Sequence, residues 1–134
     1  MTVAAQYLPK SFAVLKPDQS VETVAVGPAL YQELDRDFSG FKSHALVSVH
    51  EFSADWPSWE RHPAGDEIVV LLSGNATLVL RCGEDERRVE LGEGLEYVVI
   101  PRNTWHTAKV SNSARMLFIT PGEGTENQAI GDKQ

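Results

Sequence analysis

A chain of 134 residues with a net charge of −7 at pH 7 has the size of one domain. Its Lys and Arg residues form no cluster, which argues against a nucleic-acid or anionic-membrane surface as partner. Apolar runs reach only about five residues, against the roughly 20 that span a bilayer, and the chain start does not resemble a signal peptide. Cys82 is the single cysteine, so no disulfide forms within the chain, and we expect a cytoplasmic protein.

The first forty residues carry weak local signals. Residues 21–26 are compatible with a strand, and residues 28–38 place Leu30, Leu34 and Phe38 at helical spacing behind a proline. We expect residues 1–40 to form a less regular segment that packs on the rest of the domain or on a partner subunit.

Residues 41–52 alternate between apolar and polar side chains, which predicts a strand. His50 lies on one face of this strand together with Phe52. Two interpretations of His50 are open. It lines a ligand pocket, or it is a structural histidine that is hydrogen-bonded near a sheet edge.

Short apolar segments separated by turn signals follow along the rest of the chain. They recur at roughly 8–12-residue spacing without a long helical period, which predicts an antiparallel sandwich or barrel. The predicted strands are residues 68–72, 76–80, 89–91, 95–100, 106–110 and 115–120. The polar residues 122–134 are expected to form a loose tail.

Two imidazoles and two or three carboxylates occur in two segments that a β fold could bring together. Glu60 and His62 are two residues apart, so they share one face of a strand. A tight turn over residues 63–66 would place His62 and Glu67 across a hairpin, where paired Cβ atoms lie about 4.5–5.5 Å apart. With His106, these ligand types suit Fe(II), Mn, Zn or Ni. The alternative for each histidine is a satisfied core residue without a metal.

The spacing of these residues resembles the first motif of the cupin family. That motif has a glycine, five residues, His-x-His, three or four residues, a glutamate, six residues and a glycine. Glu60, His62, Glu67 and Gly74 follow this order and spacing. The chain departs from the motif in two places, because Glu60 stands at the first histidine position and Ala54 at the leading glycine position.

The second cupin motif is glycine, five residues, Pro-x-Gly-x-x-His-x-x-x-Asn, and the chain resembles it less closely. Gly94, Pro101 and His106 follow its order, with one extra residue before the proline. Asn103 replaces the inner glycine and Val110 the final asparagine. The first replacement is mild, because asparagine tolerates the left-handed backbone region better than most residues.

The resemblance covers residues 41–121 and implies an all-β antiparallel double-stranded β-helix, the cupin jelly-roll barrel. It also implies that His62, Glu67 and His106 bind a divalent transition metal, although some cupins keep the barrel and have lost the ion. Glu60 is either a fourth ligand or a residue that pairs with an arginine or faces solvent. If it is not a ligand, it is the candidate catalytic proton acceptor.

The resemblance makes a metal-dependent enzyme the leading functional hypothesis. Its reaction would be that of a dioxygenase, isomerase, lyase or decarboxylase on a small, oxygen-rich metabolite. The alternative is a non-catalytic small-molecule binder or sensor. We expect a homodimer, because the apolar strand at residues 68–72 needs covering on its outer face. Trp59 and Trp105 are expected to point away from the ion, whereas Trp56 could line the pocket or serve only as packing.

Overall fold

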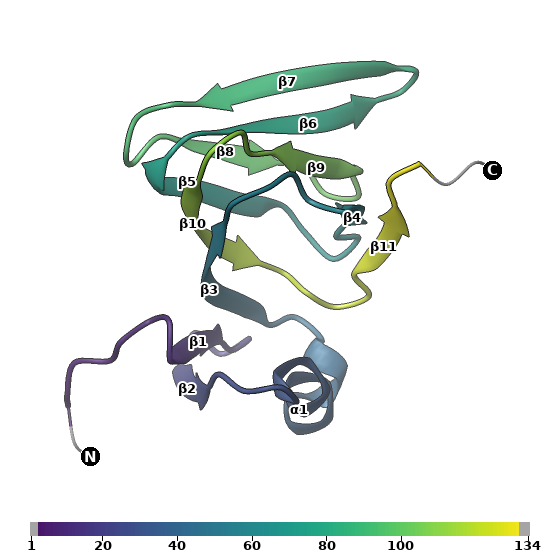
Figure 1. Ribbon diagram of the computed structural model, residues 1–134. Coiled ribbons are helices and arrows are strands. Elements are labelled where there is room, and N and C mark those ends of the chain that lie inside the picture. Colours follow the sequence, from purple (N-terminus) through teal and green to yellow (C-terminus); the bar gives the residue numbers. More distant parts are fainter. Residues whose placement is uncertain (1–2, 132–134) are drawn as a thin grey trace.

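The structure, a computed structural model, describes residues 3–131 and contains two antiparallel sheets that face each other (Figure 1). One sheet has the strand order β2-β1-β3-β10-β5-β8 and the other β11-β4-β9-β6-β7. After β3 the chain passes between the sheets at nearly every step, which is the path of a jelly roll. The predicted all-β antiparallel fold is therefore confirmed. The strands are β1 (Ser11–Leu15), β2 (Val21–Ala25), β3 (Ala45–Phe52), β4 (Ser58–Arg61), β5 (Glu67–Gly74), β6 (Ala76–Cys82), β7 (Asp85–Leu91), β8 (Tyr97–Ile100), β9 (His106–Lys109), β10 (Ala114–Thr120) and β11 (Glu126–Ala129).

The core lies between the two sheets and follows from alternation along the strands. In β5, Val69 and Leu71 are fully buried, whereas Ile68 and Val70 on the other face are half-buried. Burying a side chain of this size contributes roughly 1.5–3 kcal/mol. The core cluster comprises Trp56, Val69, Leu71, Ala76, Leu78, Leu80, Leu91, Ile100, Ala108, Val110, Ala114, Met116 and Phe118.

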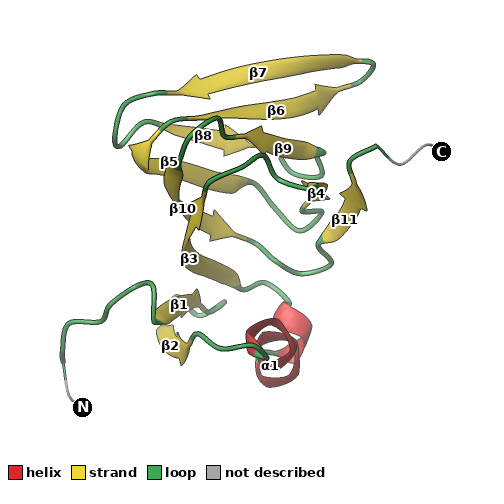
Figure 2. Cartoon of the chain, viewed as in Figure 1, coloured by secondary structure: helices red, strands yellow, loops and turns green. Residues whose placement is uncertain are grey.

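The N-terminal segment packs against one end of the barrel (Figure 1). It contains the β1–β2 hairpin, which extends the six-stranded sheet, then α1 (Leu30–Asp37) and the short 3-10 helix η1 (Ser39–Phe41), as Figure 2 shows. The predicted strand and helix are confirmed as β2 and α1. Strand β1 was not predicted, because its alternation extends over only five residues. A second apolar cluster joins the segment to β3 and comprises Phe12, Val14, Leu30, Leu34, Phe38, Phe41, Leu46 and Val49.

Helices contribute little of this chain. No helix within residues 3–131 is long and apolar enough to cross a membrane.

The predicted hairpin between His62 and Glu67 is wrong. β4 pairs with β9 and β11, whereas β5 pairs with β10 and β8, so residues 63–66 cross from one sheet to the other. Two backbone amides of the β8–β9 loop hold this crossing, because Arg102 N donates to Asp66 Oδ1 at 2.7 Å and Asn103 N donates to the His62 carbonyl at 2.9 Å. His62 and Glu67 therefore approach each other across the barrel and not along one sheet.

The described residues after 121 also differ from the predicted loose tail, of which residues 132–134 lie outside the described part of the chain. Glu126–Ala129 form β11, which pairs along β4 at the edge of the five-stranded sheet. An ion pair of 2.7 Å between Arg61 and Glu126 supports the pairing. Because backbone hydrogen bonds rather than apolar alternation form this strand, its sequence carries no strand pattern.

Candidate metal centre

Three predicted site residues meet at one end of the barrel, and three different strand ends position them. His62 directly follows β4, Glu67 begins β5 and His106 begins β9. Their side chains are buried, with 4%, 3% and 0% of their surface exposed. Glu67 Oε1 lies 3.4 Å from His62 Nε2 and 3.1 Å from His106 Nε2. The structure thus brings together the three residues that the motifs single out.

Hydrogen bonds from the opposite ring nitrogens fix both imidazoles. His106 Nδ1 lies 2.9 Å from the Thr104 carbonyl, which can only accept, so Nδ1 carries the proton. His62 Nδ1 lies 2.8 Å from Thr125 Oγ1, whose own proton goes to the Gly122 carbonyl at 3.0 Å. The Nδ1 of His62 is therefore also the donor. In the neutral rings, both Nε2 lone pairs point into the space beside Glu67.

Glu67 is held in a similar way. Thr120 Oγ1 donates to Glu67 Oε2 at 2.6 Å, which leaves Oε1 facing the two imidazoles. Burial opposes ionisation of Glu67, but the His106 and His62 imidazoles, in their protonated form, outweigh it and lower the pKa of Glu67 to about 2. Burial also opposes protonation of His106, whereas Glu67 raises its pKa overall. The carboxylate is therefore negatively charged at neutral pH.

This donor set fits a divalent cation. Among residues 3–131, His62 Nε2, Glu67 Oε1 and His106 Nε2 are buried ligand atoms without a hydrogen-bond partner, although they converge on one point. Ligand atoms of the three residues all lie within 4.8 Å of one another. Buried polar atoms in native proteins are normally satisfied, so three unpartnered atoms of this kind at one place fit a bound divalent cation. Each ligand also has an outer hydrogen-bond partner, as metal ligands usually do.

Glu60 lies beside this group rather than in it. It pairs with His106 in register across β4 and β9, and its Oε1 lies 3.5 Å from His62 Nε2. Its side chain is 32% exposed, and burial together with Glu67 raises its pKa. No arginine pairs with Glu60 within the described part of the chain, because Arg61 pairs with Glu126 instead. Glu60 thus lines the cavity beside His62, with no arginine or lysine partner among residues 3–131.

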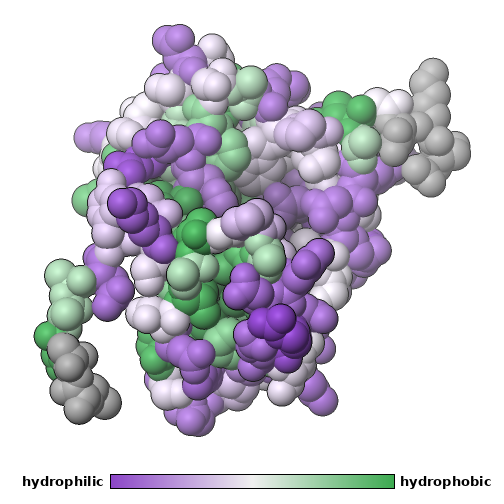
Figure 3. All heavy atoms as spheres, turned by 60° about the horizontal axis from the view of Figure 1, so that its bottom comes forward, coloured by the Kyte–Doolittle hydropathy of each residue, from purple (hydrophilic) through white to green (hydrophobic). Residues whose placement is uncertain are grey.

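A cavity of about 630 Å³ opens beside this candidate metal centre. It extends from Glu60, His62 and Glu67 toward Tyr31 of α1, so the N-terminal segment forms part of its wall. Figure 3 shows the face that carries this segment, where apolar side chains gather at the centre and hydrophilic ones surround them. The cavity has the size that binds small molecules in other proteins, about 300–1,000 Å³.

Aromatic side chains line much of this cavity. Trp56 lies with its ring centroid 6.3 Å from His106, 5.4 Å from Phe52 and 5.9 Å from Phe118. Trp56 lines the cavity, as the first of its two interpretations predicted. His50 also lines the cavity. We use the name aromatic belt for Phe52, Trp56 and Phe118.

The other two tryptophans do not line the cavity. Arg81 stacks over Trp59 at 4.1 Å and Arg61 over Trp105 at 4.6 Å, so both rings engage arginines and neither lines the cavity. This agrees with the expectation that Trp59 and Trp105 point away from the ion.

Sequence reasoning missed Thr120 and Thr125 as hydrogen-bond partners of Glu67 and His62. No local signal could have found them, because each lies more than fifty residues from its partner in the chain.

Comparison with known proteins shows the fold. No family model and no curated protein sequence matches the chain. An oxalate oxidase in complex with the substrate analogue glycolate is similar with a TM-score of 0.52 at 18% identity, over 61% of this chain and 45% of that one. A mutant of Bacillus subtilis oxalate decarboxylase has a TM-score of 0.51 at 13% identity, over 64% of this chain and 24% of that one. A cupin-2 domain containing protein from Shewanella frigidimarina has a TM-score of 0.49 at 19% identity, over 57% and 70%.

The likeness to the two oxalate enzymes and the strand topology show that the chain has the cupin fold, as the two motifs predicted. The chain spans less than half the length of either oxalate enzyme. At such low identity the likeness concerns the fold and not the reaction.

Proposed function

We propose that this cupin-fold chain is a metal-dependent enzyme acting on a small, oxygen-bearing molecule. His62, Glu67 and His106 would hold one divalent ion, Fe(II), Mn(II), Zn(II) or Ni(II). The observation that carries the proposal is the convergence of three buried, unpartnered ligand atoms at the end of a cavity of about 630 Å³. Nitrogen and carboxylate ligands without a thiolate suit these ions.

The residues around the ion divide the remaining work between them. A bound divalent ion supplies Lewis acidity and, in the case of iron, redox chemistry. Thr104 and Thr125 keep the two imidazoles in the tautomer that presents Nε2. Glu60 reaches into the cavity, and its raised pKa brings it closer to the range in which a carboxylate exchanges protons near neutral pH. We assign Glu60 the role of proton acceptor.

The experiment begins with the elemental content of protein purified without a metal-affinity tag. The protein is then loaded with Fe(II), Mn(II) or Zn(II) and incubated with hydroxy acids, keto acids, sugars and catechols, with and without oxygen. Mass spectrometry follows substrate loss. Oxygen-dependent loss with iron alone would identify a dioxygenase, and oxygen-independent loss with several metals an isomerase, lyase or decarboxylase. A compound that binds at the metal but returns unchanged with every ion would replace the enzyme by a binder or sensor.

We also propose that the chain forms a homodimer through the outer face of its six-stranded sheet. This face presents a continuous apolar surface in which Tyr97 and Val99 of the edge strand β8 are 63% and 45% exposed. The register places them beside residues of β5 and β10 on the same face. The surface comprises Ile68, Val70, Tyr97, Val99, Leu117 and Ile119. Such patches are rare on monomers.

Light scattering tests the dimer. The expected mass is about twice the 14.8 kDa of the chain at micromolar concentration, and Val99→Glu should reduce it to the monomer mass. A wild-type protein that stays monomeric across dilution would refute the dimer.

We place the protein in the cytoplasm, because the free and exposed Cys82 suits a reducing compartment.

A further inference from the structure

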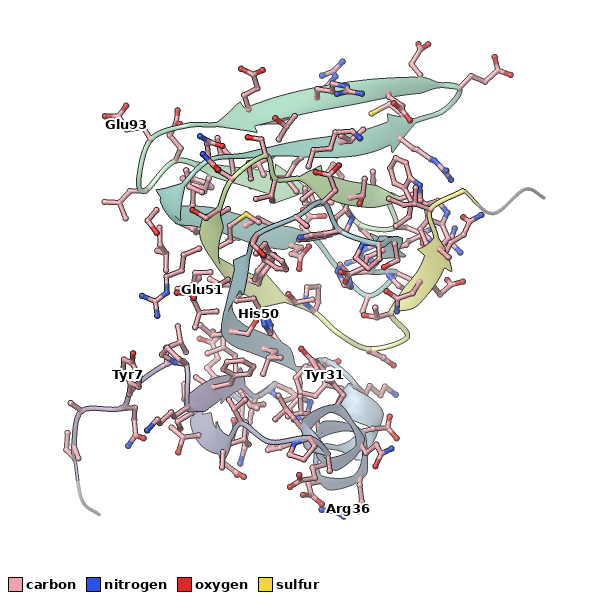
Figure 4. All side chains as sticks on the ribbon, viewed as in Figure 1. Tyr7, Tyr31, Arg36, His50, Glu51 and Glu93 are labelled. Atoms are coloured by element: carbon pink, nitrogen blue, oxygen red, sulfur yellow. The ribbon has the colours of Figure 1, made fainter. Side chains whose placement is uncertain are left out.

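His50 is a polar side chain in the cavity wall that the metal centre does not use. It projects from β3 on the side facing the N-terminal segment, above Tyr31 of α1 (Figure 4). Its ring packs among aromatic rings, with centroids 5.6 Å from Phe12, 6.2 Å from Phe52 and 5.8 Å from Phe118. No hydrogen bond to its imidazole forms within residues 3–131. The ring nitrogens are thus available to a molecule in the cavity.

The chemistry of this position is that of a neutral imidazole. Burial among the aromatic rings lowers the pKa of His50, so the ring is uncharged at neutral pH. A neutral imidazole offers one N–H donor and one acceptor nitrogen. It can therefore recognise a hydroxyl or carbonyl substituent without demanding a charge on the ligand.

The aromatic belt connects this position to the metal centre. Trp56 touches His106 at one end, and Phe118 contacts both Trp56 and His50 at the other. A wall of aromatic rings favours a flat, unsaturated body, which can stack or meet the rings edge-on. A two-carbon acid such as oxalate has no such body and would leave most of a cavity of about 630 Å³ empty.

We propose that the cavity binds a planar aromatic molecule that spans from the metal centre to His50. A carboxylate or hydroxyl group of this molecule faces the ion, its ring system lies along the aromatic belt, and a hydrogen-bonding substituent at its far end meets the His50 imidazole. His50 thereby determines specificity for the substituted end. This inference rests on the proposed function, because it requires the ion at His62, Glu67 and His106.

Binding to the Zn(II)-loaded protein tests it, since zinc has no redox chemistry. The probes are benzoate and 2-naphthoate, their hydroxylated partners 4-hydroxybenzoate and 6-hydroxy-2-naphthoate, and the non-aromatic controls oxalate and cyclohexanecarboxylate. We expect the aromatic acids to bind about tenfold more tightly than cyclohexanecarboxylate. In at least one pair, the hydroxylated acid should bind about tenfold more tightly than its parent acid, a typical value for one hydrogen bond to a buried group. Calorimetry measures the affinities.

Three variants separate the role of His50 from a general effect. His50→Phe fits the aromatic surroundings and should remove the gain from the hydroxyl while leaving the affinity of the parent acid unchanged. His50→Gln should restore part of the gain. His44→Phe is the matched control, because His44 also packs against aromatic rings, Phe38 and Phe41, but does not line the cavity. It should leave every affinity unchanged.

Two results would overturn the inference while leaving the proposed function intact. One is equal affinity of the zinc protein for the aromatic acids and the non-aromatic controls. The other is a hydroxyl gain that survives in His50→Phe. A protein that takes up no zinc would instead refute the proposed metal function, and this inference with it. The zinc content of each sample, measured before calorimetry, distinguishes the two failures.

Discussion

The two ends of the cavity hold their histidines by different means. At the metal end, hydrogen bonds fix the tautomer of His62 and His106 and leave unpartnered nitrogens pointing inward. At the other end, only aromatic packing holds His50, and no hydrogen bond within the described residues fixes its ring. The first arrangement would preorganise the proposed ion site, because the orientation of the donor atoms is set before binding. The second leaves the ring nitrogens free to adapt to a ligand.

The largest effect that tests this contrast is expected from His106→Ala. Removing a ligand should reduce metal affinity by more than the roughly 10–100-fold lost when an outer partner is removed, so occupancy should fall to background. Elemental analysis after reconstitution measures occupancy, and circular dichroism should still show a folded β protein. His44→Ala serves as the control histidine. Equal occupancy of wild type and His106→Ala would contradict the assignment of the metal end.

Glu60→Gln separates a proton acceptor from a fourth ligand. Because Glu60 lies outside the group of three, we expect metal occupancy to be retained while turnover of the identified substrate falls roughly 10²–10⁴-fold. The control is Glu126→Gln on the neighbouring strand β11, where the carboxylate pairs with Arg61. A loss of metal in Glu60→Gln would make Glu60 a ligand.

Thr125→Val tests whether hydrogen bonding preorganises the metal end. The variant keeps the side-chain shape but removes the acceptor for His62 Nδ1, so metal affinity should weaken roughly 10–100-fold. Thr107→Val is the matched control, because Thr107 is buried near the site but donates to the Ser58 carbonyl and not to a ligand. Competition with a chelator measures both. Equal weakening in the two variants would indicate a general loss of stability instead.

The smallest effect concerns the pH dependence of stability at His50. The pKa of His50 is lowered in the folded protein, whereas in the unfolded chain it is about 6.5. Below that pH the unfolded state binds more protons, so acidification costs stability until the folded pKa is reached. Between about pH 7 and pH 5, the Tm of wild type should fall more than that of His50→Phe, by on the order of a degree or two. If the Tm of wild type and that of His50→Phe fell equally with pH, His50 would not be desolvated in the folded protein.

The sequence predicted the fold and the three central residues of the site because their signals are local. His62 and Glu67 are separated by a fixed short spacing, and His106 follows its own motif. The replacement of glycine by Asn103 is tolerated as expected, since Asn103 adopts φ 61°. The hairpin prediction failed because a turn signal shows that the chain reverses but does not show which sheet it enters next.

The outer supports and the aromatic belt depend on contacts between distant parts of the chain. Thr125 supports His62 from 63 residues away, and β11, which follows it, has no apolar alternation. His50 presented two interpretations from sequence, and only the packing of Phe12 and Phe118 around it distinguishes them. A single sequence carries no signal for such pairings, because they are set by tertiary structure and not by local periodicity.

Strand β11 has a consequence for how the protein can be shortened or fused. A truncation after residue 121 would retain His62, Glu67, His106 and Glu60 and every segment that resembles the cupin motifs. It would nevertheless remove the Thr125 hydroxyl, and with it the only side chain that contacts His62 Nδ1 in the described structure. A domain boundary drawn from motif coverage alone would therefore yield a barrel that keeps all the proposed ligands but leaves His62 without its hydrogen-bond partner.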